Sequence, residues 1–83
     1  MRNPADDAAF LETIAEQVIA HRRLRKLSQA ELATLCGTSQ PGVARLERGA
    51  TAPRIDTLLR VAEALDCDLV VQFRARTRPR GER

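Results

Sequence analysis

The chain has 83 residues and a formal net charge of +3, with 43% hydrophobic and 30% charged residues, which indicates one small globular domain. Aromatic residues make up only 2% of the sequence, so aliphatic side chains must fill the core. No apolar run approaches the roughly 18 residues of a transmembrane helix, and residues 1–7 do not lead into an apolar signal segment. We therefore expect a cytoplasmic protein with no membrane association.

The side chains that carry most enzyme chemistry are scarce. His21 is the single histidine, and the two cysteines, Cys36 and Cys67, lack the spacing of a zinc site, which needs four ligands. None of the GxSxG, HExxH or phosphate-loop motifs occurs. We expect reduced cysteines packed as small hydrophobic residues, no metal or other cofactor, and no enzyme activity.

The first expected helix begins after Asn3, a favoured N-cap, with Pro4 at its first position. Apolar side chains then recur at a helical period and form one stripe: Phe10, Leu11, Ile14, Ala15, Val18 and Ile19. The helix runs into the basic cluster of residues 22–26, which suits the negative end of its dipole.

A second helix is expected to open at Ser28, because Ser28 and Glu31 have the S-x-x-E spacing of a capping box. Gly37 is placed to end this helix as a left-handed cap. Thr38 or Ser39 can then cap a third helix almost at once, so a very short turn joins the second helix to the third.

The third helix has an apolar inner side, formed by Val43 and Leu46, and Gly49 ends it. Its outer side carries small residues and hydrogen-bonding groups: Gln40, Gly42, Ala44 and Arg45. Two short helices joined through a glycine turn are typical of a helix-turn-helix, whose second helix enters the major groove of DNA. The basic residues also favour DNA binding, since most are arginine, which forms forked hydrogen bonds to phosphates and base edges.

A fourth helix is expected from five residues on one face, and Asp66 closes it: Ile55, Leu58, Leu59, Ala62 and Leu65. Residues 69–73 then alternate in the manner of a short strand. Residues 74–83 carry five arginines and no large apolar residue, so we expect a disordered arm, which either follows the DNA backbone or only aids solubility. The chain thus divides into the N-terminal part of the first helix (1–20), a helix-turn-helix core (21–66), a strand (67–73) and an arginine-rich tail (74–83).

Three segments together resemble the phage-repressor (Xre/Cro-like) helix-turn-helix family. They are SQAELATLCGTSQ at residues 28–40, RLERG at 45–49 and LLRVAEAL at 58–65. The resemblance extends from Leu24 to Leu69. It implies an all-α, lambda-repressor-like domain of four to five helices that binds double-stranded DNA at palindromic operators, usually as a dimer.

The resemblance also assigns roles to individual residues. It implies that Gln29, Thr38 and Ser39 contact the phosphate backbone, and that Gln40 and Arg45 read base edges. The chemistry of the last two agrees, because glutamine pairs with adenine and arginine with guanine. The alternatives are a solvated surface amide for Gln40 and a surface ion pair, for example with Glu47, for Arg45.

Arg48 and Arg54 flank the loop after the third helix and are expected to meet phosphates. For Arg54 the competing interpretation is packing at the N-terminus of the fourth helix. Arg22 and Glu47 match a basic–acidic pair of the family, which implies a structural salt bridge between the first and third helices.

Leu69, Val71 and Phe73 form the apolar row of the expected strand. One strand cannot satisfy its own backbone groups, and the chain offers no second strand to pair with it. We therefore expect the strand to pair with its copy in a homodimer. The alternative is that the segment folds back on its own helices.

Three functions fit these features. The first is a sequence-specific transcriptional repressor. The second is an antitoxin that neutralises a toxin protein and also represses its own operon, because small members of the resembled family with a terminal strand are similar to such antitoxins. The third is a protein-interaction module without base-specific DNA reading, which Pro41 and Gly42 in the third helix keep open.

Overall fold

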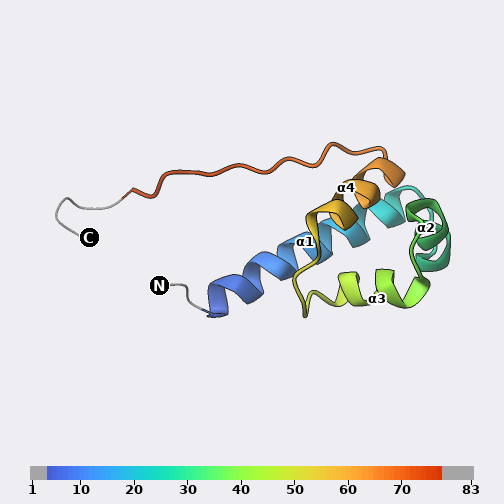
Figure 1. The fold of residues 1–83 in the computed structure, drawn as a ribbon, viewed down its shortest axis with the longest axis horizontal. Helices are drawn as coiled ribbons and strands as arrows, with labels where there is room; N and C mark the ends of the chain where they lie inside the picture. The colour runs from blue at the N-terminus through green and yellow to red at the C-terminus, as the bar shows by residue number, and fades with distance from the viewer. Residues whose placement is uncertain (1–3, 78–83) are drawn as a thin grey trace.

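The computed structural model of the chain describes residues 4–77 and contains four helices over that range: α1 (Pro4–Leu24), α2 (Gln29–Cys36), α3 (Gln40–Arg48) and α4 (Ile55–Ala64). Helix α2 packs against both α3 and α4, and α1 packs against α3; in Figure 1 α1 lies between α4 above and α3 below. The all-α fold class expected from the sequence is confirmed. None of the described helices is long and apolar enough to cross a membrane.

The short helices begin and end at the residues that the sequence indicated. Ser28 caps α2, with the Glu31 amide donating to the Ser28 hydroxyl at 3.0 Å and the Ser28 amide donating to the Glu31 carboxylate at 2.8 Å. Ser39 caps α3 by accepting from the Gly42 amide at 3.1 Å. Gly37 follows α2 in the left-handed conformation with φ of 70°. Asn3, the expected cap of α1, lies outside the described residues.

Nine buried side chains from all four helices and the end of α4 form one hydrophobic core: Val18, Leu32, Ala33, Cys36, Val43, Leu46, Leu58, Val61 and Leu65. Gly49 brings the end of α3 against α1. It has a positive φ of 67°, and a Cβ there would lie 3.2 Å from the Ala15 Cβ and 3.3 Å from the Leu11 carbonyl. Both the backbone conformation and the close approach therefore require glycine at this position.

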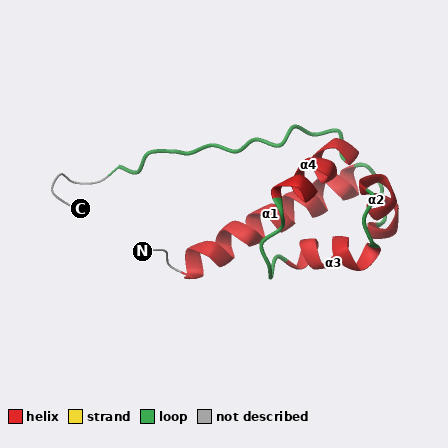
Figure 2. Ribbon diagram, viewed as in Figure 1, coloured by secondary structure: helices red, strands yellow, loops and turns green. Residues whose placement is uncertain are grey.

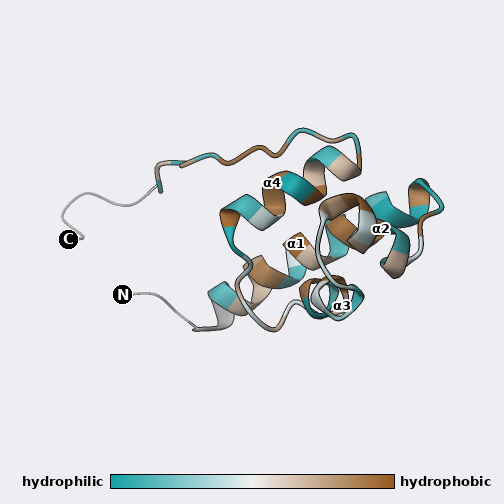
Figure 3. Ribbon diagram, turned by 45° about the vertical axis from the view of Figure 1, so that its right-hand side comes forward, coloured by the Kyte–Doolittle hydropathy of each residue, from teal (hydrophilic) through white to brown (hydrophobic). Residues whose placement is uncertain are grey.

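The expected apolar stripe on α1 is buried only in part. Ala15 and Val18 are buried, whereas Phe10 keeps 66% of its surface exposed. In Figure 1 the N-terminal half of α1 extends beyond the other helices, and the hydropathy colouring of Figure 3 shows hydrophobic (brown) segments on α1. Phe10 instead lines an open apolar groove of about 360 Å³ between α1, α4 and the segment that follows α4.

The strand expected over Leu69–Phe73 does not form within the single chain. Figure 2 shows helices and loops in the described part of the chain, which has no strand. Leu69 packs against the core, whereas Val71 is 65% and Phe73 is 100% exposed, so the expected apolar row is divided between two environments. The physical reason is that an extended segment becomes a strand only when another strand pairs with it. Residues 74–77 are also exposed, and the rest of the expected arm lies outside the described residues.

Candidate nucleic-acid interface

Helix α3 presents one face to the core and the opposite face to solvent. Val43 and Leu46 are buried and hold the helix against α1 and α2. Gln40, Arg45 and Arg48 are exposed. The apolar contacts thus fix the helix, while its polar side chains are free to meet another molecule, as a recognition helix requires.

An ion pair between Arg22 and Glu47 ties α1 to α3. The Arg22 Nε donates to one carboxylate oxygen at 2.6 Å and a terminal nitrogen donates to the other at 3.0 Å, which makes the pair bidentate. The other terminal nitrogen of Arg22 donates to the Leu27 carbonyl at 2.8 Å. Only 12% of the Arg22 side chain and 5% of the Glu47 side chain are exposed, so the pair is largely shielded from water.

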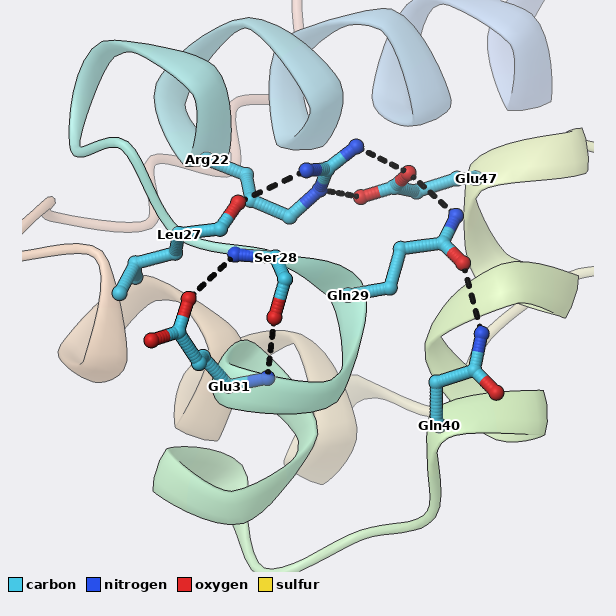
Figure 4. A network of polar contacts seen from close by, with 7 residues as sticks. All are labelled: Arg22, Leu27, Ser28, Gln29, Glu31, Gln40 and Glu47. Atoms are coloured by element: carbon cyan, nitrogen blue, oxygen red, sulfur yellow. Dashed lines mark hydrogen bonds and ion pairs between the residues drawn. The ribbon is translucent and has the colours of Figure 1, made fainter.

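The Glu47 carboxylate also connects, through Gln29, to Gln40 on the surface that is expected to face DNA. The Gln29 Nε2 donates to Glu47 Oε1 at 3.0 Å, and the Gln29 Oε1 accepts from the Gln40 Nε2 at 2.9 Å. Figure 4 shows the resulting chain of side chains, which runs from Arg22 on α1 to Gln40 at the start of α3. We call Arg22, Glu47, Gln29 and Gln40 the polar relay.

Hydrogen bonds within the polar relay shift the pKa values of its two ionisable groups, Glu47 and Arg22. Burial raises the pKa of the Glu47 carboxyl, but hydrogen bonds from Arg22 and Gln29 outweigh that effect. The positive charges of Arg22 and Arg23 act in the same direction, and the pKa of Glu47 lies below its ordinary value. The hydrogen bond to Glu47 raises the pKa of Arg22 further. Both groups are therefore ionised at neutral pH.

The turn between α2 and α3 exposes Thr38 and Ser39. The Ser39 oxygen accepts from the Gly42 amide, which leaves its hydroxyl hydrogen available to an outside acceptor such as a phosphate oxygen. The Thr38 amide donates to the Ala33 carbonyl at 2.9 Å, which fixes the backbone of the turn. Both hydroxyls lie beside Gly42, because a Cβ on Gly42 would be 3.1 Å from one and 3.2 Å from the other.

The three arginines expected to meet DNA differ in their surroundings. Arg45 and Arg48 are exposed, and the described ion pairs include neither of them. Glu47, a candidate partner of Arg45, is held by Arg22 instead. Arg54 pairs with Asp56 at 3.2 Å, and both of these side chains are well exposed, so Arg54 has a local partner at the N-terminus of α4.

Two features of this surface were missed by sequence reasoning. Gln29, which is expected at the phosphate backbone, also bridges Glu47 and Gln40 and keeps one N–H for an outside partner. Arg23, next to the ion pair, places a further exposed positive charge close to Glu47. The sequence does place a glutamine at the first position of both α2 and α3, but it could not show that the amides of Gln29 and Gln40 meet.

Comparisons with known proteins agree with this fold. Residues 18–72 match the family model HTH_3, described as helix-turn-helix. The P22 c2 repressor, solved in complex with a synthetic operator, superposes with a TM-score of 0.63 at 33% identity. That match covers 66% of this chain and 83% of the P22 chain.

Two curated relatives are each 38% identical to this chain. One is y4dL of Sinorhizobium fredii, described as an uncharacterized HTH-type transcriptional regulator, matched over 60 residues, 72% of this chain and 31% of the relative. The other is the antitoxin HigA1 of Mycobacterium tuberculosis, matched over 64 residues, 77% of this chain and 43% of HigA1. The match therefore spans less than half the length of either relative.

Proposed function

The chain belongs to the helix-turn-helix family of DNA-binding transcription regulators, and from this premise we propose that it is a sequence-specific repressor that acts as a homodimer on a palindromic operator. In this proposal α3 enters the major groove, Gln40 and Arg45 read bases, and Gln29, Thr38, Ser39 and Arg48 meet phosphates. Arg54 also contacts a phosphate, for which it gives up its ion pair with Asp56. The exposed Arg74 and Arg76 would extend the contact along the backbone.

The polar relay is the observation that carries this proposal. Because Gln40 gives one amide hydrogen to Gln29, its carbonyl oxygen and its second amide hydrogen remain for a base. One acceptor beside one donor is the pattern that pairs with the N6 and N7 atoms of adenine. The largely shielded Arg22–Glu47 pair anchors the relay, so this orientation is held before DNA arrives.

The proposed homodimer uses the segment after α4. Val71 and Phe73 are exposed apolar side chains on extended backbone, and antiparallel pairing with the same segment of a second copy would cover them and satisfy the backbone groups. The pairing would hold two copies of α3 about one DNA turn apart, roughly 34 Å, as binding to two half-sites requires.

The test begins with repeated selection of random duplexes by the full chain. Titration of the selected duplex and of a scrambled duplex by fluorescence anisotropy then measures specificity, and repetition at several salt concentrations measures the phosphate contribution. The proposal expects a selected sequence with two-fold symmetry and a strong salt dependence. A protein-interaction module without DNA reading would select no sequence and bind neither duplex.

A second candidate function is that of an antitoxin. The observation that favours it is the identity of 38% with the antitoxin HigA1 over 77% of this chain. Such a protein would bind a toxin protein in addition to its operator. Co-expression of the chain with the adjacent reading frame of its operon tests this: rescue of growth and co-purification in a fixed ratio support the antitoxin role, and neither is expected of a repressor alone.

A further inference from the structure

Pro41 occupies the most outward position near the start of α3. Successive residues of an α-helix are about 100° apart around the axis. The buried residues Val43 and Leu46 define the inward direction, and Pro41 lies almost opposite their midpoint. Gln40 lies on one flank of Pro41 and Arg45 on the other, and all three side chains are exposed.

The surface between Gln40 and Arg45 has no side-chain donor or acceptor. Pro41 contributes an apolar ring and has no backbone N–H, and Ala44 contributes a half-buried methyl group. The two polar side chains are thus separated by an apolar strip, which Pro41 and Ala44 form at a spacing of three residues on one face.

Gly42 lies about 100° around the axis from Pro41, beyond Arg45, where it packs beside the turn that precedes α3. A Cβ at position 42 would lie 3.1 Å from the Thr38 Oγ1 and 3.2 Å from the Ser39 Oγ, closer than ordinary contacts. Any larger residue would have to displace the hydroxyls of the turn, one of which caps α3. Glycine at position 42 therefore preserves the turn and the cap that place Pro41 in the first turn of α3.

Only one apolar group lines the floor of the major groove, the C5 methyl group of thymine, which 5-methylcytosine also carries. We propose that the Pro41 ring, supported by the Ala44 methyl group, packs on the C5 methyl group of a pyrimidine beside the base pair that Gln40 reads. This inference rests on the proposed function and names the base chemistry that the middle of α3 recognises. It gives a role to Pro41, whose side chain cannot read a base through hydrogen bonds.

The experiment uses the full chain and the duplex that it selects. Each thymine of one half-site is replaced in turn by uracil, which removes only the methyl group, and affinity is measured by fluorescence anisotropy. We expect one such replacement to weaken binding about fourfold, the change that corresponds to burial of one methyl group. Replacing that thymine–adenine pair by 5-methylcytosine–guanine and by cytosine–guanine shows whether the methyl group of either pyrimidine suffices.

Two variants assign the effect to Pro41. Pro41→Ser removes the apolar ring at an exposed position and is expected to bind the thymine and uracil duplexes equally. Pro41→Val keeps an apolar side chain and is expected to retain the preference for thymine. Circular dichroism confirms that both variants keep the helix content of the natural chain.

Failure of the inference is distinct from failure of the proposed function. If the chain selects a sequence but binds its thymine and uracil forms equally at every position, the methyl contact is absent while DNA recognition stands. If Pro41→Ser keeps the full uracil penalty, another residue makes the contact. If the chain selects no sequence, the proposed function is wrong and the inference falls with it.

Discussion

The Gln40 Nε2 donates to the Gln29 Oε1 at 2.9 Å, so the side chains of the first residue of α3 and the first residue of α2 hold each other in place. Gln29 is itself held by Glu47 at 3.0 Å, inside a largely buried ion pair. The base-reading orientation proposed for Gln40 therefore depends on residues of all three helices that precede α4.

Gln29→Ala should reduce base discrimination at the pair read by Gln40. Without Gln29 the Gln40 amide rotates freely, so part of the roughly 1–3 kcal/mol that a bidentate contact contributes to discrimination is lost. The measurement is the affinity of Gln29→Ala, Gln40→Ala and the double variant for duplexes that differ at that pair. Non-additive losses support positioning, whereas a uniform loss for every duplex would reduce Gln29 to a phosphate contact.

Arg22→Ala and Glu47→Ala should each destabilise the fold by about 3 kcal/mol, because removal of one partner leaves the other charge poorly solvated. A double-mutant cycle in urea measures the coupling. The exposed pair Arg25 and Asp66, with 3.0 Å between the Arg25 Nη2 and the Asp66 Oδ2, is the matched control and should couple by about 1 kcal/mol or less. Equal coupling in the two cycles would contradict the structural role of the buried pair.

Acid should weaken the fold partly through Glu47. Its pKa is lower in the folded chain than in the unfolded chain, so its contribution is present above the unfolded pKa of about 4.3 and is lost as the pH falls through the folded value. Glu47→Gln should therefore show a flatter decline of unfolding free energy below pH 5 than the natural chain. Hydrogen bonds with Ser28 lower the pKa of Glu31 as well, so Glu31→Gln is measured in parallel to separate its share of the decline from that of Glu47. Indistinguishable slopes for the natural chain and Glu47→Gln would refute this.

Val71→Pro should convert the proposed dimer to a monomer, because proline removes a backbone donor from the pairing strand. Val71 is 65% exposed and lies outside the helices, so circular dichroism should show unchanged helix content. Analytical ultracentrifugation measures the mass. An intact dimer of the variant would show that the contact between copies lies elsewhere, for example on the groove beside Phe10.

The helix boundaries could be predicted because their signals are local. Ser28 with Glu31, Gly37, Ser39 and Gly49 each act on a backbone within a few residues of themselves. The Gln29–Gln40 bond could not be predicted, because it depends on the angle at which α2 meets α3. The same holds for Phe10, whose helical spacing matches the core but whose part of α1 extends past the helices that would bury it.

The central claim is that α3 reads DNA sequence, and Arg45→Ala tests it most directly. Arg45 is exposed on α3 and is proposed to read a guanine, whereas Arg48→Ala removes only a proposed phosphate contact from the same helix. Both variants are titrated against the selected and the scrambled duplex at one salt concentration. We expect Arg45→Ala to lose about 1–3 kcal/mol of affinity for the selected duplex alone, and Arg48→Ala to weaken both duplexes alike. Equal losses of Arg45→Ala on the two duplexes would contradict base reading by α3.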